Sequence, residues 1–437
     1  MKFNKSNELR KISHKLIPGG AHTYSKGDDQ FPVLSPGFIS HGQGAYVWDV
    51  DGNKFLDWGM GLRSVVLGHA CKPVVEVVKK QLDLGVNFSK PSILEIELAQ
   101  KLHDIIPSAE MVKFNKNGSA TTNAAVKLAR AYTKRDMVAM PAGSYNGSND
   151  WGMATTAIDS GIPKSIKKMT VTFEYNNIES VKNLFKKYSG KIACFILEPA
   201  SEVEPKNNFL QNLQRLCKKN NTVLIFDEMI TGFRWHVKGA QYVYGVTPDL
   251  STFGKAMANG FSLAVLVGKR EIMQLGGMYG KHERVFLLSS THGAETHALA
   301  ATIKTIDEII NKNVCNHIDK IGKNLKNELN KIIKNNELDD VLNIFGTHGS
   351  RVAMSVKEFG GYGILEIKTY FFQEMIRRGV LFNGYFAPSF SHKETEVNKT
   401  VKAWNIVCKK LKLALKQKNL EKMLIGDAIK PVFRKFN

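Results

Sequence analysis

Two stretches of the chain end in side chains that could act together on an aldehyde. The apolar run Val223–Phe226 is followed by Asp227-Glu228, and a second short strand is predicted over Asp249–Gly254, directly before Lys255. A lysine at the end of a buried strand loses its proton more easily, because burial disfavours the charged amine. The neutral amine can then attack an aldehyde and form a Schiff base. Since Asp227 could pair with a protonated ring nitrogen, the two residues predict covalent chemistry on a ring that carries an aldehyde.

Each of these residues also has an ordinary structural explanation. Asp227 could cap a helix or pair with Arg234, and most lysines of a protein are solvated at its surface. Taken alone, neither residue predicts catalysis. The combination does, because each of the two residues closes a predicted strand of the sheet.

A third element is the stretch 117–122, Asn-Gly-Ser-Ala-Thr-Thr, directly before a predicted helix. A turn of this composition at a helix N-terminus offers free N–H groups and the positive end of the helix dipole, which suit a phosphate dianion. The alternative is a plain helix cap by Ser119 or Thr121. A phosphate cradle, a Schiff-base lysine and a carboxylate for a ring nitrogen form a binding set for pyridoxal 5′-phosphate.

The elements that must position these residues lie between about 90 and 310. Helical patterns at Ile93–Ile105 and Thr121–Tyr132 alternate with short apolar runs. These runs are Met137–Met140, Cys194–Leu197, Val223–Phe226 and Ala264–Val267. The alternation predicts an α/β fold with a mostly parallel sheet covered on both faces. In such sheets functional groups gather beyond the carboxyl ends of the strands.

The two ends of the chain have a different sequence pattern. Residues 1–60 predict a helix, a turn at Pro18-Gly19-Gly20 and a hairpin around Asp51-Gly52. After about 315 we expect a long helix over 316–335, strands near 351–356 and 380–382, and a helix over 396–416. We therefore predict a large cofactor-binding domain over 61–314. A smaller α+β domain is expected from 315–437, joined by the N-terminal segment 1–60.

Composition narrows the class of protein. The chain has 437 residues, of which 43% are hydrophobic and 23% charged, which excludes collagen-like and wholly disordered proteins. The formal net charge of +21 raises nucleic-acid binding as a minor alternative, but the lysines are scattered and follow no recognition motif. The 5 cysteines form no Cys-x-x-Cys pair, and no apolar run approaches the ~20 residues of a membrane span. We expect a cytoplasmic protein without a signal peptide.

Several longer stretches together resemble a known family. They are Gly44–Gly52, Leu67-Gly68-His69, Glu198-Pro199, Leu224–Arg234, Pro248-Asp249 and Gly254-Lys255. The chain looks like a class III aminotransferase of fold type I, dependent on pyridoxal phosphate. Its pattern is most similar to the glutamate-1-semialdehyde 2,1-aminomutase-like branch.

The resemblance implies a role for each matching residue. Lys255 would hold the cofactor covalently and move a proton at the substrate, and Asp227 would keep the pyridine nitrogen protonated. Thr291 would reach the phosphate of the neighbouring subunit's cofactor, so the resemblance implies a homodimer with shared active sites. The other implied cofactor contacts are Gly118 and Ser119 at the phosphate, Tyr145 and Met229 on the two ring faces, and Glu198 near the ring.

The departures from the family pattern lie where substrate identity is set. Asn146 replaces the expected histidine, and Ala294-Glu295-Thr296 replaces the expected Gly-Asn-Pro. The mutase's carboxylate-binding arginine has no counterpart, because no Arg occurs from Lys11 to Leu62, and Lys26 stands at about its place. A match to the mutase's gating glutamate is also missing. We therefore favour a transaminase with a different substrate over the mutase, which stays the alternative.

The substrate itself is only weakly indicated. Lys26, His22, Arg63 and Trp58 are candidates for the substrate wall, and the stretch 20–30 is similar to proteins of bacterial surface-polysaccharide synthesis. A sugar-like or nucleotide-linked acceptor is therefore possible. His292 and His297 flank Glu295 without the helical spacing of a metal site, so no metal is predicted.

Overall fold

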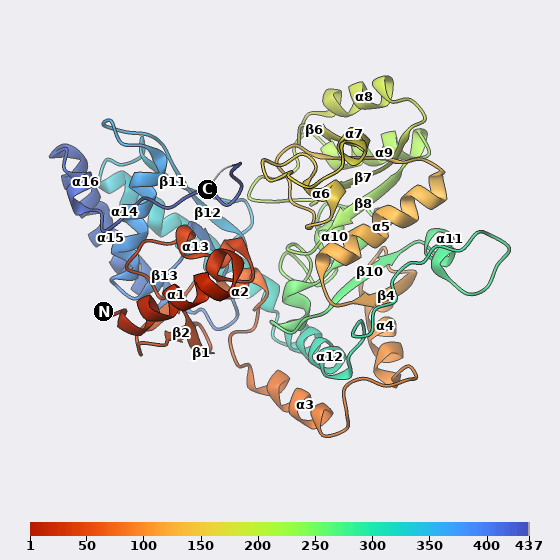
Figure 1. Cartoon of the computed structure of the whole chain (residues 1–437), viewed down its shortest axis with the longest axis horizontal. Helices are drawn as coiled ribbons and strands as arrows, with labels where there is room; N and C mark the ends of the chain where they lie inside the picture. Colours follow the sequence, from red (N-terminus) through yellow and green to blue (C-terminus); the bar gives the residue numbers. More distant parts are fainter. Residues whose placement is uncertain (436–437) are drawn as a thin grey trace. The chain divides into compact units, whose positions relative to one another are not determined.

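The computed structural model describes residues 1–435, which fall into two compact units. One unit combines Met1–Cys71 with Asn316–Arg434, and the other spans Lys72–Cys315. In Figure 1 the red and blue elements, which come from the two ends of the chain, lie together in the first unit. The N-terminal contribution extends to Cys71 because Gly44 and His69 pair through their backbones, with N–H···O distances of 2.9 and 2.8 Å.

The second unit is built on a mixed sheet with the strand order β4-β10-β9-β8-β7-β5-β6. Its strands are β4 (Met111–Asn115), β5 (Met137–Pro141), β6 (Thr170–Phe173), β7 (Ile192–Leu197), β8 (Val223–Asp227), β9 (Leu250–Phe253) and β10 (Ala264–Gly268). The neighbours from β6 to β9 pair in parallel. β10 runs antiparallel to both β9 and β4, so the run Ala264–Val267 does not continue the parallel series. The reason is its short connection to β9, which contains the 3-10 helix η4 (Lys255–Ala258) and no crossover helix.

Helices cover both faces of this sheet. Successive side chains of β7, which point to opposite faces, pack against different helices. On β7, Cys194 and Ile196 pack in the cluster that holds Leu128 of α5 (Gly118–Thr133). Phe195 packs on the other face, in the cluster that holds Leu213 of α9 (Phe209–Lys219). A strand buried on both faces needs the continuous apolar sequence that this chain has. The remaining helices of the unit are α3 (Lys72–Leu82), α4 (Ile93–Ile105), α6 (Asp150–Met153), α7 (Lys164–Met169), α8 (Ile178–Lys187), α10 (Ala240–Val243), α11 (Arg270–Met273) and α12 (Thr296–Asn311).

The first unit holds two smaller sheets. The order β1-β2-β3-β13 joins β1 (Ile39–Gln43), β2 (Tyr46–Asp49), β3 (Lys54–Asp57) and β13 (Val380–Leu381). The order β11-β12-β14 joins β11 (Leu342–Phe345), β12 (Val352–Val356) and β14 (Tyr385–Phe386). The hairpin predicted around Asp51-Gly52 is confirmed, since β2 and β3 pair antiparallel. The helices of this unit are α1 (Asn4–Leu16), α2 (Met60–Arg63), α13 (Val314–Asn335), α14 (Ile364–Ile376), α15 (Glu394–Lys416) and α16 (Leu420–Met423).

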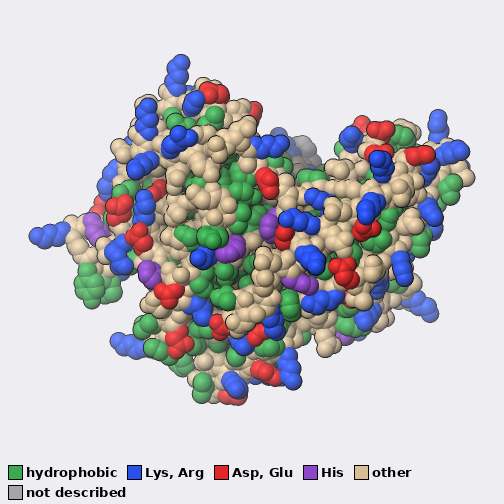
Figure 2. Space-filling view, turned by 180° about the vertical axis from the view of Figure 1, so that it is seen from behind, with side chains coloured by type: hydrophobic (Ala, Val, Ile, Leu, Met, Phe, Trp, Pro, Cys, Tyr) green, Lys and Arg blue, Asp and Glu red, His purple; other side chains and the backbone are tan. Residues whose placement is uncertain are grey.

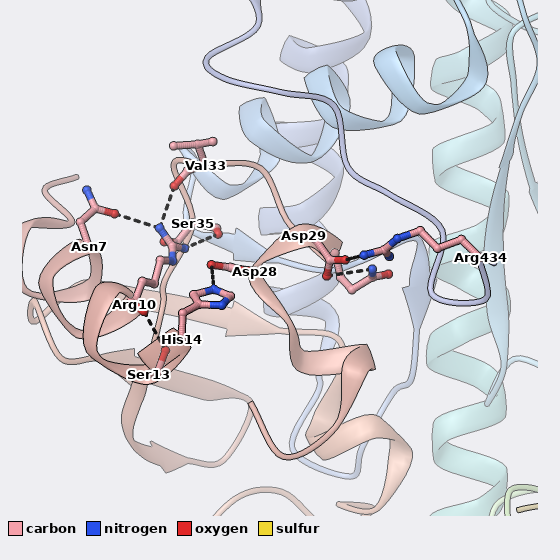
Figure 3. Close-up of polar contacts among 10 residues, drawn as sticks. Asn7, Arg10, Ser13, His14, Asp28, Asp29, Val33, Ser35 and Arg434 are labelled. Atoms are coloured by element: carbon pink, nitrogen blue, oxygen red, sulfur yellow. Dashed lines mark hydrogen bonds and ion pairs between the residues drawn. The ribbon is translucent and has the colours of Figure 1, made fainter. Parts of the chain in front are cut away.

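The N-terminal segment is tied into the first unit by polar contacts, as Figure 3 shows. Arg10 of α1 donates to the carbonyls of Val33 at 3.1 Å and Ser35 at 2.9 Å. Asp29 pairs with Arg434 at 2.7 Å, which joins the two ends of the described chain. Among residues 1–435, none of the helices combines the length and apolar character that a membrane crossing requires.

Candidate active site

Asp227 ends β8 at the edge where the parallel strands terminate. Its neighbour on β9 is Thr252, whose hydroxyl donates to Asp227 Oδ1 at 3.1 Å. The backbone N–H of Met229 donates to the same oxygen at 3.2 Å. The residue is only 4% exposed. Burial, with the nearby charge of Glu198, raises the pKa of Asp227 to about 6, while Lys255 acts in the opposite direction.

Lys255 lies one strand away, just beyond the end of β9. Gly254 is fully extended, and Lys255 then takes a left-handed conformation with φ of 44° at the start of η4. Few side chains adopt this region, and residues held there cluster at functional sites. The charge of Lys255 lowers the pKa of Asp227, and both residues lie at the ends of neighbouring strands, at the same edge of the sheet. Asp227 and Lys255 each close a strand, as predicted, and the structure shows that these two strands are neighbours in the sheet.

Met229 connects this edge of the sheet to residues 117–119 at the start of α5, the predicted phosphate site, which we call the cradle turn. A Cβ added at Gly118 would lie 3.1 Å from Met229 Sδ, and one added at Gly254 would lie 2.7 Å from it. The sulfur therefore packs against both glycines, at the start of α5 and just before Lys255. The loops after β4, β8 and β9 converge around one side chain, and a larger residue at either glycine would push it aside.

The cradle turn is capped by Asn117, which the sequence analysis did not single out. The Asn117 side chain accepts a hydrogen bond from the backbone N–H of Ala120 at 2.9 Å. The predicted alternative, a cap by Ser119 or Thr121, is wrong. The signal was present, because asparagine is a preferred N-cap residue and stands directly before the first helical residue. Gly118 and Ser119 then form the first turn of α5, at the positive end of its dipole.

Ser119 is held by the loop that follows β5. Its hydroxyl oxygen accepts from the backbone N–H of Ser148 at 3.0 Å, and Asn149 donates to its carbonyl at 2.6 Å. Gly147, with φ of 109°, packs so closely that an added Cβ would lie 2.8 Å from Ser119 Cα. Tyr145 is in the same loop and is half exposed. The loop thus fixes Ser119 and also carries the Tyr145 ring.

Glu228, next to Asp227, has a structural task. It is fully buried and accepts hydrogen bonds from Thr231 at 2.7 Å and from the backbone N–H groups of Ala240 and Gln241 at 2.6 and 2.9 Å. Burial raises the pKa of Glu228. The helix-capping explanation considered for Asp227 therefore applies to Glu228, which leaves Asp227 facing the edge of the sheet.

The sequence model of the family Aminotransferase class-III matches residues 24–390. The glutamate-1-semialdehyde 2,1-aminomutase of Sulfurihydrogenibium azorense is 32% identical over 430 residues, which cover 92% of this chain and 98% of that protein. The enzyme of the same name from Alkaliphilus oremlandii is 33% identical and covers 92% of this chain and 97% of its own length. The chain belongs to the class III aminotransferases.

Solved structures agree with this fold. A transaminase with PLP bound has a TM-score of 0.87 at 22% identity, covering 95% of this chain and all of the other. A glutamate-1-semialdehyde aminomutase from Pseudomonas aeruginosa has a TM-score of 0.81 at 19% identity, covering 93% of this chain and 94% of the other. The chain thus has fold type I and is a pyridoxal-phosphate-dependent transaminase or aminomutase.

The residues of the second unit fit this cofactor chemically. The first turn of α5 presents backbone donors to an anion, and the buried Asp227 is suited to a cationic ring nitrogen. Lys255 is the amine at this edge of the sheet, and Gly118 and Gly254 allow Met229 to pack beside it. Glu198 follows β7 and acts on Asp227. Thr291 is exposed in the loop before α12, where its carbonyl accepts from Asn87 at 3.0 Å.

The residues predicted for the substrate wall all lie in the first unit. His22 and Lys26 belong to the segment between α1 and β1, and Arg63 stacks on the Tyr385 ring at 4.6 Å. Trp58 has a different role. It is fully buried, stacks on His392 at 4.2 Å and donates to Thr400 at 2.9 Å, so it belongs to the core of that unit.

Proposed function

We propose that this protein is an aminotransferase that moves an amino group from an amino acid donor to a carbonyl acceptor in two half-reactions through Lys255. The observation that carries the proposal is the meeting of Asp227, Lys255 and the first turn of α5 around Met229. This set combines an ionisable amine, a carboxylate for a ring nitrogen and donors for a phosphate.

When bound, pyridoxal phosphate supplies an aldehyde that amines attack and a ring that takes up electrons. Lys255 Nζ would hold the aldehyde in the resting enzyme and, when free, would accept a proton from the substrate α-carbon. Asp227, which accepts hydrogen bonds from Thr252 and Met229, would keep the ring nitrogen protonated. Gly118 and Ser119 would bind the phosphate, Tyr145 and Met229 would pack on the ring faces, and Glu198 would order the polar groups beside the ring.

The intramolecular mutase is the second candidate, because curated relatives at 32–33% identity carry that name. Two features of this chain favour a transaminase. The nearest arginine before Leu62 is Arg10, which is committed to the carbonyls of Val33 and Ser35. Lys26 stands near the place of the mutase's carboxylate-binding arginine, and a lysine cannot reproduce its two parallel hydrogen bonds.

We further propose a homodimer in which Thr291 serves the neighbouring subunit's cofactor. The segment after α3 holds the Thr291 loop, since Asn87 donates to the Thr291 carbonyl and Thr296 donates to the carbonyl of Gly85 at 2.9 Å. Large apolar side chains of the same region are more than half exposed, namely Leu84, Phe88, Ile93 and Ile96. A second copy of the chain would bury them.

The acceptor is proposed to carry an anionic group, for which Lys26, His22 and Arg63 are the candidate contacts. Figure 2 shows Lys and Arg side chains scattered over one face of the molecule, with Asp and Glu side chains between them. Such a mixed surface favours a small-molecule enzyme over the nucleic-acid binder suggested by the net charge of +21.

The cofactor test compares the parent protein with a Lys255→Ala variant. The parent should take up pyridoxal phosphate with a yellow absorbance that borohydride fixes covalently on Lys255, and the variant should not be labelled. A parent that takes up no pyridoxal phosphate would contradict the proposal.

The reaction test screens amino donors and carbonyl acceptors against the pyridoxal and pyridoxamine forms. We expect transamination of a donor such as glutamate. In parallel, glutamate 1-semialdehyde is added to the pyridoxamine form without a donor. Isomerisation of glutamate 1-semialdehyde, with no transamination of any donor and acceptor pair, would contradict our proposal and support the mutase.

A further inference from the structure

An ion pair joins the cradle turn to the loop that carries Thr291. Lys116 stands between the end of β4 and Asn117, the cap of α5, and its ammonium contacts the carboxylate of Glu295. The two side chains are 24% and 15% exposed, so water screens the pair less than it would a surface pair. This is one of the places where the chain departs from the family pattern, because Ala294-Glu295-Thr296 replaces Gly-Asn-Pro.

Glu295 uses both carboxylate oxygens for these cross-links. One oxygen contacts Lys116, and the other pairs with His292 Nδ1 at 2.8 Å, next to Thr291. The hydrogen bond from Lys116 is the main reason why the pKa of Glu295 is lowered, so the carboxylate is ionised at neutral pH. Glu295 is also the N-cap residue of α12, yet its side chain makes no capping bond there. Its carboxylate serves the connection to β4 instead.

Weaker contacts support the same connection. Ser290 donates to the side-chain oxygen of Asn115, the last residue of β4, at 3.3 Å. The carbonyl of Lys116 accepts from Ser262 at 2.7 Å, which fixes the backbone beside the ion pair. The Thr291 loop is therefore bound to the strand that leads into the cradle turn, and the Lys116–Glu295 pair is the charged link between them.

We propose that Glu295 is a positioning residue that holds the Thr291 loop in register with the N-terminus of α5 through Lys116. The inference rests on the proposed function, in which both elements meet a cofactor phosphate. Through this link, the cradle of one subunit and the threonine that serves its partner keep a fixed geometry. Glu295 touches no reacting atom, so its loss should weaken cofactor binding and leave the chemistry of the loaded enzyme largely unchanged.

The experiment measures cofactor affinity and loop dynamics in a Glu295→Gln variant. Titrating the apoenzyme with pyridoxal phosphate should show binding about tenfold weaker than in the parent, which corresponds to about 1.4 kcal/mol. At saturating cofactor, kcat should stay within about twofold of the parent, as expected for a group that acts on binding alone. Hydrogen exchange in the apoprotein should become faster in the peptide 288–296, and this readout needs no cofactor.

Four further variants distinguish a positioning role of Glu295 from other effects. Lys116→Arg keeps a cation and should retain affinity, whereas Lys116→Gln should match Glu295→Gln, and the double variant should be no worse than either single one. Asp307→Asn breaks a comparable ion pair, Lys101–Asp307 at 2.7 Å, and should change nothing measured here.

Several outcomes would overturn the inference. If Glu295 acted only by its negative charge near a phosphate, the Gln variant would bind the cofactor more tightly. Unchanged exchange in 288–296 with unchanged affinity would show that the loop is held without the pair. A parent that binds no cofactor would instead contradict the proposed function, and the inference with it.

Discussion

At the scale of single residues, the buried Asp227 lowers the stability of the protein when no cofactor is bound. Burial and Glu198 raise its pKa to about 6, so the folded apoprotein binds a proton there more tightly than the unfolded chain does. The stability from this proton is complete below the ordinary pKa of an aspartate and is lost as the pH rises through about 6. At neutral pH the buried carboxylate therefore destabilises the apoprotein, and a cationic group bound beside it would offset this effect.

An Asp227→Asn variant should separate these two effects. The apo variant should be more stable than the parent at pH 7.5, by about 3 kcal/mol at most, and the difference should vanish below about pH 4. At the same time its turnover should fall about 100-fold or more, because the ring proton loses its counter-charge. Urea unfolding at several pH values and steady-state kinetics measure the two. Lower stability of the variant at pH 7.5 would contradict the account.

Gly254 is a second residue whose substitution has a clear expected effect, because there is little room for a side chain at this position. Its backbone is extended, so alanine brings no backbone strain, but the new Cβ would lie 2.7 Å from Met229 Sδ. Gly254→Ala should displace Met229 and weaken pyridoxal phosphate binding about tenfold or more, as expected for overpacking of about 1–3 kcal/mol. Adding Met229→Ala removes the clash together with a proposed ring contact, so we expect a partial recovery of the affinity. Absorbance titration measures both, and a double variant no better than the single one would show that the clash lies elsewhere.

At the scale of elements, the ends of the strands position the functional side chains, and Glu228 anchors the loop that follows β8. Its carboxylate ties Thr231 to the start of α10. A Glu228→Gln variant places an N–H group among these donors and should cost about 2–4 kcal/mol of stability. Thermal unfolding measures the loss. Thr231→Val keeps the shape of the side chain, removes the single 2.7 Å hydrogen bond from its hydroxyl to Glu228 and should cost less. A destabilisation by Glu228→Gln smaller than that by Thr231→Val would contradict this role.

Much of this arrangement was predictable from local sequence, and the limits have physical reasons. The end of β8 was visible because a strand buried on both faces has a continuous apolar run that stops at a polar residue. β9 contains Ser251 and Thr252, and its end was indicated by Gly254 before Lys255. The antiparallel direction of β10 was not, since an apolar run has the same composition in either direction. The Asn117 cap is a local contact whose signal was overlooked, whereas the contact of Met229 with two glycines and the Lys116–Glu295 pair depend on residues distant in sequence. No local pattern reports such contacts.

At the scale of the whole molecule, the proposed homodimer gives a test that assigns Thr291 to one subunit or the other. A Lys255→Ala subunit and a Thr291→Ala subunit should each form weak or inactive homodimers. In a mixed dimer, the subunit with intact Lys255 receives Thr291 from its partner, so one site becomes complete. Refolding equal amounts together should give about a quarter of the parental activity. No recovery, with mixed dimers verified by tags, would place Thr291 in its own subunit's site.

The composition of the first unit from Met1–Cys71 and Asn316–Arg434 has a consequence for biosynthesis. When the N-terminal strands leave the ribosome, the helices and strands that must cover them have not yet been translated. At typical elongation rates, the wait lasts on the order of tens of seconds, during which Lys72–Cys315 can fold first. The apolar residues of β2 and β3 stay uncovered through that interval, so the nascent chain is an expected client of ribosome-associated chaperones.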